Sequence, residues 1–253
     1  MWIGAGLVLL AIPALLLNLG LLPLSDDEGI RATVALEMLA SGDFLTPRLF
    51  DELYLNKPPL FNWLLAGWFV LLGSSSEFAA RSFTVLALAV FVWYIYRQNR
   101  KHLYTDGDAF QAWLPALAFL TCGRVLFWDS MLALIDITFS LVIYALFVHV
   151  HASGSRRRWG WLFAGAYALA AAGFMLKGLP AVVFLGLTLL TWFAWQKRWS
   201  PSFQPGTPAG QPVPRASPRC VLRFLFAGKR WGGHLRNALS RIRQAHFRRA
   251  RDG

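Results

Sequence analysis

The sequence has 253 residues, of which 56% are hydrophobic, and several apolar stretches approach the ~20 residues needed to cross a bilayer. This composition excludes an ordinary soluble domain and predicts an integral membrane protein. The net charge of +12 comes from the end of the chain, because residues 1–196 carry equal numbers of basic and acidic side chains, whereas residues 197–253 are strongly basic.

The apolar segments, taken in chain order, predict six membrane spans. The first, 2–24, lacks the basic start and the cleavage site of a signal peptide, so we expect it to be retained as a span. Segment 60–73 is short and follows Pro58 and Pro59, which predicts a juxtamembrane or re-entrant element instead of a span. The predicted spans are 2–24, 79–96, 110–128, 131–150, 160–176 and 179–196.

Basic clusters set the predicted orientation of these spans. The runs 97–102, 155–158 and 197–198 are rich in Lys and Arg, which favours the cytoplasmic side. Two spans separate each run from the next, so the parity is consistent. The loop after the first span and the stretches 128–136 and 176–180 are then expected on the outer side.

The outer loop after the first span begins with a predicted helix of about fifteen residues. Ser25 and Glu28 have the S-x-x-E spacing of a capping box, and Gly42 stands where such a helix ends. One face of this helix is apolar, which suits the surface of the outer leaflet. The residues of that face are Ile30, Val34 and Met38. Arg31 and Glu37 are expected to point away from it.

Residues 199–253 differ in composition from the rest of the chain, with many prolines followed by an Arg-rich stretch. Binding to anionic lipid is one interpretation, and binding to nucleic acid is another. Arg, Pro, Gly and Ala also dominate out-of-frame translation of a GC-rich gene. We therefore expect a disordered tail, or a tail that follows a reading-frame break or truncation, and no nucleic-acid partner.

Ionisable residues gather on the predicted outer side, namely Asp26, Asp27, Glu28, Arg31, Lys57, Asp129, Asp136 and Lys177. Such groups are costly at membrane depth unless they pair or serve a site. Carboxylates and cations together suit an anionic lipid carrier. A cation stabilises the charge that grows on a leaving polyprenyl phosphate, and a carboxylate accepts the proton of an attacking hydroxyl.

Each of these residues also has a plainer interpretation. Acids at 26–28 are favoured in a first helical turn, and Arg31 can pair with Asp27 one turn earlier. Lys57 can extend its ammonium group to lipid headgroups, and Asp136 can be an ordinary interfacial residue. Neither the two cysteines nor the five histidines of the chain form a disulfide framework or a zinc-ligand spacing.

A resemblance adds to this interpretation. The stretch 25–83, with "DDEGIR", "EMLASGDF", "NKPPLFNW" and "SEFAAR", closely resembles the first outer loop of family 39-type glycosyltransferases. These GT-C-fold enzymes include the bacterial aminoarabinose transferases that act on lipid A and the protein O-mannosyltransferases. "ALIDITFS" is similar to the family's second acidic motif, and "FMLKGLP" is similar to its T-K-G-P motif. The resemblance covers about residues 1–198, the amino-terminal portion of the family's chains.

The resemblance implies roles for six residues. The catalytic candidates are Asp27, Glu28 and Asp136. The candidates that bind the lipid phosphate are Lys57, Arg31 and Lys177. Lys57 matches the lysine that contacts this phosphate, Asp27 matches the catalytic Asp of the family, and Asp136 matches its second acidic position.

Three departures from the family pattern matter. Asn56 replaces a Glu implicated in metal coordination, so we expect no metal or other cofactor and keep a divalent cation only as an alternative. Arg31 stands one residue later than the family's Arg. Family members also run to roughly twice this length, with further spans and often an extracytoplasmic domain.

The expected fold is therefore all-α and polytopic, with GT-C-type transmembrane helices and an outer loop that carries amphipathic juxtamembrane helices. The resemblance implies a multi-pass enzyme of the bacterial inner membrane, active on the periplasmic or extracellular face. It would move a sugar from a polyprenyl phosphate to lipid A, another glycolipid or a protein of the cell envelope, among membrane lipids. The alternative is a truncated, non-catalytic membrane fragment that still binds the lipid phosphate.

Overall fold

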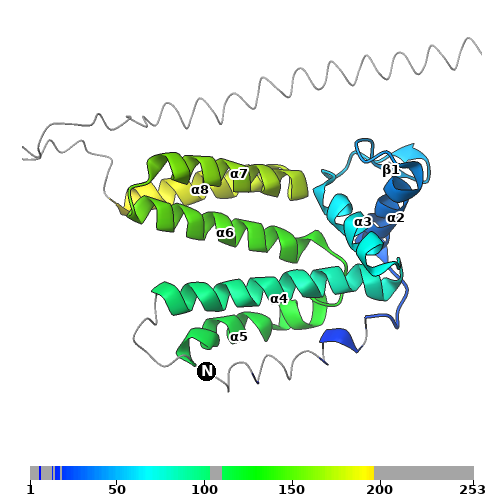
Figure 1. Ribbon diagram of the computed structural model, residues 1–253, viewed down its shortest axis with the longest axis horizontal. Helices are drawn as coiled ribbons and strands as arrows, with labels where there is room; N and C mark the ends of the chain where they lie inside the picture. The colour runs from blue at the N-terminus through cyan, green and yellow to red at the C-terminus, as the bar shows by residue number, and fades with distance from the viewer. Residues whose placement is uncertain (1–5, 7–12, 14, 18, 103–109, 197–253) are drawn as a thin grey trace, which may run out of the picture. The chain divides into compact units, whose positions relative to one another are not determined.

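The computed structural model describes residues 6, 13, 15–17, 19–102 and 110–196 (Figure 1). The predicted first span lies mostly outside these residues, and the predicted tail lies entirely outside them. The described elements are α2 (Asp26–Ser41), β1 (Arg48–Leu49), β2 (Glu52–Leu53), α3 (Leu60–Leu72), α4 (Glu77–His102), η1 (Gln111–Trp113), α5 (Leu114–Leu120), η2 (Val125–Asp129), α6 (Ile135–Ser155), α7 (Trp159–Lys177) and α8 (Leu179–Trp195). The all-α prediction is confirmed, apart from one small hairpin.

Helix α2 begins and ends where the sequence predicts. Ser25 and Glu28 form the capping box, and Gly42 ends the helix with a φ of 71°, a left-handed conformation that glycine adopts without strain. The apolar face of α2 does not meet lipid, however. Val34 and Met38 are buried in a small cluster with Tyr54 of the following loop, so protein covers the face that we expected on the outer leaflet.

The β1–β2 hairpin is the one departure from the all-α prediction among the described residues. Its two turn residues, Phe50 and Asp51, both have positive φ, as a type I′ turn requires. Phe50 is not a usual residue for this turn, and neither position is a glycine, so the sequence carries no Asn-Gly or Asp-Gly hairpin signal. Glu37 of α2 accepts a 2.6 Å hydrogen bond from the Phe50 amide, which ties the turn to the helix.

Three of the described helices are long and apolar enough to span a membrane, namely α4, α6 and α7. Helix α8 has 17 residues and falls just below the span length, and α3 has only 13 residues. A 13-residue helix is about 20 Å long, shorter than the ~30 Å hydrocarbon layer, which fits the expected juxtamembrane or re-entrant element.

The predicted span 110–128 is not a single continuous helix. Helix α5 ends at Leu120, and the wide π-helical turn η2 follows after a break. At the break, the Thr121 hydroxyl donates to the Leu117 carbonyl and Gly123 follows closely, and both features weaken a helix.

The ends of the described helices form two separate groups. The rings of His102 and His151 lie 6.5 Å apart, which brings the carboxyl ends of α4 and α6 together, next to the basic residues that link α6 to α7. At the other ends, one apolar cluster joins α2, α3 and the start of α4 to the start of α6 and the end of α7. We call this second region the ionic end, because the ion pairs described below lie there. Helices α6, α7 and α8 pack side by side (Figure 1).

Candidate functional site

A buried ion pair between Glu28 and Arg81 lies at the centre of the ionic end. The Glu28 carboxylate accepts from Arg81 Nη2 at 2.7 Å and Nε at 3.1 Å. It also accepts from the backbone amides of Ser25 at 3.1 Å and Ala133 at 3.0 Å. The carboxylate therefore joins the start of α2, the start of α4 and the loop before α6.

The Arg81 guanidinium is equally well satisfied. Besides its bonds to Glu28, it donates to the carbonyls of Leu19, Leu22 and Pro23 over 2.7–3.1 Å. These contacts account for all five of its N–H donors. Burial alone would raise the pKa of Glu28, but the hydrogen bonds from Arg81, Ala133 and Ser25 outweigh it and hold that pKa below its ordinary value.

Arg31 is the opposite case. Its side chain is 2% exposed, so protein buries it, although we expected it only to point away from the apolar face of α2. Its guanidinium lies over the ring of Tyr54, 5.4 Å from the ring centre, and its Nη1 atom is buried without a partner. The alternative of an Asp27–Arg31 ion pair is also not realised, because within residues 19–102 and 110–196 Arg31 has no carboxylate within 4.0 Å.

Lys57 is half-buried just before Pro58 and the start of α3. In the described part of the chain it takes part in no ion pair or hydrogen bond. Tyr54, whose ring lies under the Arg31 guanidinium, comes three positions before Lys57 in the sequence. Because three residues of fully extended chain span at most about 11 Å, the backbones of Tyr54 and Lys57 are no farther apart than that. Asp27 is exposed in the first turn of α2.

Asp136 and Lys177 form the pair that the sequence placed on one side of the membrane. Lys177 Nζ lies 2.5 Å from Asp136 Oδ1, and it also lies 5.5 Å from the centre of the Phe139 ring. Asp136 is in the first turn of α6 and Lys177 is the last residue of α7. Both side chains are partly exposed.

Asp129, another expected member of the acidic group, is buried in η2 and pairs with Arg124 at 3.3 Å. Its second carboxylate oxygen, Oδ1, is buried without a partner. Arg81 is the important residue that received no role from the sequence. The available signals were its place in the "SEFAAR" motif and its position as the one charged residue of the predicted span 79–96.

No metal site is evident among the described residues, which contain no group of three His, Cys, Asp or Glu side chains suited to an ion. Asn56 is exposed and supplies an amide in place of the expected carboxylate. These described residues do not fit a divalent cation.

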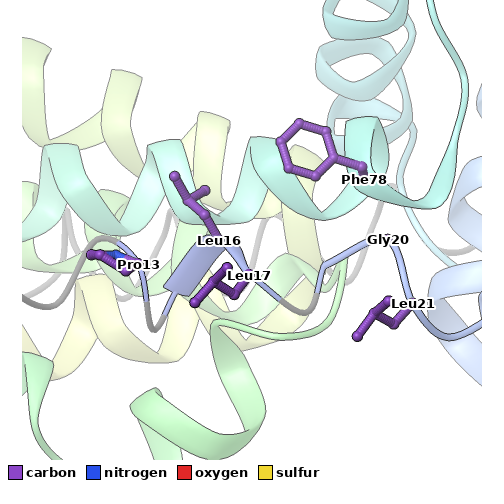
Figure 2. A pocket seen from close by; sticks show the side chains of 6 residues that line it. All are labelled: Pro13, Leu16, Leu17, Gly20, Leu21 and Phe78. Atoms are coloured by element: carbon purple, nitrogen blue, oxygen red, sulfur yellow. The ribbon is translucent and has the colours of Figure 1, made fainter.

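One cavity is lined by no charged residue. It is an apolar groove of about 520 Å³ lined by Pro13, Leu16, Leu17, Gly20, Leu21 and Phe78 (Figure 2). None of the six predicted site residues lines it, and it offers no hydrogen-bonding side chain to a polar substrate. A groove of this kind suits hydrocarbon chains.

Comparisons with known proteins identify relatives of this chain. Two proteins of Sodalis glossinidius (strain morsitans), described as undecaprenyl phosphate-α-4-amino-4-deoxy-L-arabinose arabinosyl transferases 2 and 1, are each 31% identical over 72% and 75% of this chain. The alignments cover 34% of each relative, so the chain spans about a third of their length.

Solved structures are also similar to this chain. The crystal structure of ArnT from Cupriavidus metallidurans bound to undecaprenyl phosphate is 25% identical, with a TM-score of 0.65, over 78% of this chain and 36% of that one. The apo structure of the same protein is 24% identical with the same TM-score and coverage, and this likeness supports the fold.

A family profile gives the broadest assignment. The profile described as dolichyl-phosphate-mannose-protein mannosyltransferase matches residues 56–208, more than half of the chain. This match includes Lys57, the Arg81 region and the Asp136–Lys177 pair. The chain therefore belongs to the dolichyl-phosphate-mannose-protein mannosyltransferase family.

Proposed function

We propose that this chain provides the donor-binding part of a membrane glycosyltransferase that uses a polyprenyl-phosphate-linked sugar. The first candidate for the acceptor is a lipid, lipid A above all, and the second candidate is a protein. The site faces the periplasmic or extracellular side of a bacterial inner membrane. The names of its relatives and the undecaprenyl phosphate bound to ArnT support this class of donor.

The buried, unpaired charge of Arg31 is the observation that carries the proposal. A guanidinium taken out of water costs several kcal/mol unless an anion accompanies it. The described residues supply no such anion, and stacking on Tyr54 replaces only part of the lost hydration. A lipid phosphate between Arg31 and Lys57 would satisfy both cations.

The reaction is a single displacement. The acceptor oxygen forms a bond to the anomeric carbon of the sugar while the bond from that carbon to the phosphate oxygen breaks. The bonding electrons go to the phosphate, where Lys57 and Arg31 stabilise the added charge. Asp27 accepts the proton of the acceptor hydroxyl, and the configuration at the sugar carbon inverts.

The remaining predicted site residues take supporting places in this proposal. Asp136 orients Lys177, whose ammonium group can reach an anionic oxygen once the pair loosens. Glu28 is a positioning residue, because Arg81 and two backbone amides occupy its carboxylate. It fixes the first turn of α2, which also carries Asp27.

The test uses the full chain in lipid nanodiscs with labelled undecaprenyl phosphate as the binding probe. Lys57→Gln and Arg31→Gln are each expected to weaken binding at least about tenfold, equivalent to about 1.4 kcal/mol. Lys101→Gln removes an exposed lysine at the other end of α4 and serves as the matched control. Unchanged binding in both site variants would contradict the proposal.

Transfer is measured separately, with undecaprenyl phosphate-4-amino-4-deoxy-L-arabinose as the donor and lipid A as the acceptor. Asp27→Asn is expected to keep donor binding and lose transfer. If the unmodified chain binds the donor and transfers nothing, the non-catalytic alternative is correct for this chain.

A further inference from the structure

The Arg124–Asp129 pair lies outside the donor site proposed above, and no role has been assigned to it so far. It is built on the wide turn η2, whose π-type bond runs from the Ser130 amide to the Val125 carbonyl at 2.9 Å. Residues five positions apart point about 140° away from each other around an ordinary α-helix. The wide turn is what allows Arg124 to meet Asp129, and such turns are frequent at functional sites.

The two side chains differ in exposure. Asp129 is buried, whereas the Arg124 side chain is 68% exposed. The carboxylate holds Arg124 through Nε at 3.3 Å, and among the described residues the two terminal nitrogens of the guanidinium have no partner. A guanidinium presents these nitrogens as a rigid fork that matches a phosphate. Asp129 therefore fixes the base of an arginine whose fork is directed outward.

Two large apolar side chains on the same turn, Phe127 and Trp128, are also exposed. Aromatic residues in such places lie at the level of lipid headgroups, where the ring meets acyl chains and polar groups remain hydrated. An arginine fork beside exposed rings matches the phosphate and the hydrocarbon of one amphiphile.

The turn lies at the ionic end of the helices. Ala133, four residues after Asp129, donates its amide hydrogen to Glu28. The Arg124–Asp129 pair therefore belongs to the same set of helix ends as Asp136 and Lys177, and no described contact joins it to Lys57 or Arg31.

We propose that Arg124, held by Asp129 and flanked by Phe127 and Trp128, binds the phosphate of an anionic lipid other than the polyprenyl donor. The inference rests on the proposed function, in which the phosphate belongs to the lipid acceptor. The Oδ1 atom of Asp129 is buried and accepts no hydrogen bond from the described residues. A headgroup hydroxyl near the phosphate could donate that bond, so the site should prefer lipids that carry one.

The experiment measures retention of labelled lipids by the full chain in detergent, with lipid A, phosphatidylglycerol, phosphatidylcholine and undecaprenyl phosphate as probes. Arg124→Gln is expected to lower lipid A binding at least fivefold and to leave undecaprenyl phosphate binding unchanged. Arg124→Lys keeps the charge without the fork and should retain an intermediate affinity. Arg158→Gln, an exposed arginine at the start of α7, is the control.

Asp129→Asn tests the anchoring role of Asp129. Because Arg124 is then no longer held in place, the variant should discriminate less between one anionic lipid and another. Circular dichroism shows whether each variant keeps its helices. If Arg124→Gln does not fold, Arg124→Lys takes its place in the binding measurements. Equal losses for lipid A and phosphatidylglycerol support the phosphate site and identify its ligand as bulk lipid. Unchanged binding of all anionic lipids in Arg124→Gln overturns the inference.

Lys57→Gln separates this inference from the proposed function. Loss of undecaprenyl phosphate in Lys57→Gln with loss of lipid A in Arg124→Gln supports both. Loss of lipid A alone, in Arg124→Gln, supports this site and contradicts the donor site. A loss of undecaprenyl phosphate in Arg124→Gln, without loss of lipid A, overturns the separate site.

Discussion

Two arginines of the ionic end have almost the same burial and very different surroundings. Arg81 uses all five of its N–H donors on Glu28 and three carbonyls, whereas Arg31 lies over one aromatic ring with a buried nitrogen that has no partner. A fully paired buried charge holds the fold together, and an unpaired one is costly until a ligand arrives. The comparison separates the scaffold from the proposed binding site without any bound molecule.

Breaking the Arg81 side of this comparison should have the largest effect. Arg81→Gln leaves the Glu28 carboxylate buried and unpaired, which should cost about 3–5 kcal/mol of unfolding free energy. The change in stability is measured by thermal unfolding in detergent, with the loss of monodisperse protein as the signal. Arg97→Gln, an exposed arginine of the same helix, is the control and should be close to neutral. The double variant Glu28→Gln/Arg81→Gln should lose less than the two single losses together.

Substitution of Arg31 should give the opposite result. Arg31→Leu removes an unpaired buried charge, so the ligand-free protein should be as stable as the unmodified chain or more stable. Undecaprenyl phosphate at about 100 times the Kd of the unmodified chain should stabilise that chain by about 2.7 kcal/mol, and a variant that binds at least tenfold more weakly should gain at most about 1.4 kcal/mol. A large loss of ligand-free stability in Arg31→Leu would assign Arg31 to the scaffold and remove the contrast.

The pH dependence of stability sharpens the scaffold side. The pKa of Glu28 is lowered from its ordinary value of 4.5, so its contribution is present above that value and is lost as the pH falls through the lower folded-state pKa. The unfolding temperature should therefore drop on acidification below about pH 4.5, and the drop should be shallower in Glu28→Gln. Glu52→Gln, an exposed carboxylate of the hairpin, should keep the slope of the unmodified chain.

The sequence predicted the elements whose signals are local. The capping box of Ser25 and Glu28, the end of α2 at Gly42 and the long apolar helices are encoded by adjacent residues. The break at Thr121 was missed because hydropathy does not register a local hydrogen bond to the backbone. The hairpin was missed because Phe50 and Asp51 lack the usual turn chemistry.

The site was predicted less completely than the fold, for a physical reason. Asp136 and Lys177 were placed on one side by counting spans, and the structure adds that they form an ion pair there. The partners of Glu28 and the burial of Arg31 depend on long-range packing, which residue spacing does not specify. The positions of charged residues along the sequence therefore could not distinguish Arg81, a scaffold residue, from Arg31, a proposed ligand-binding residue.

The smallest expected effect concerns Asn62 of α3, a neutral counterpart of Arg31. Its side chain is 0% exposed, and neither its Nδ2 nor its Oδ1 has a hydrogen-bond partner among the described residues. It shares a buried helical face with Leu65 and Phe69, which are apolar and cannot supply one. A buried amide without hydrogen bonds costs about 1–3 kcal/mol. Asn62→Leu should therefore stabilise the ligand-free protein by about 1 kcal/mol, since the larger side chain offsets part of the gain. Phe69→Leu, a conservative change on the same face, should instead destabilise it. If Asn62→Leu also abolishes ligand-induced stabilisation, the amide belongs with Arg31 at the phosphate, whereas normal stabilisation would confine the binding site to the charged groups.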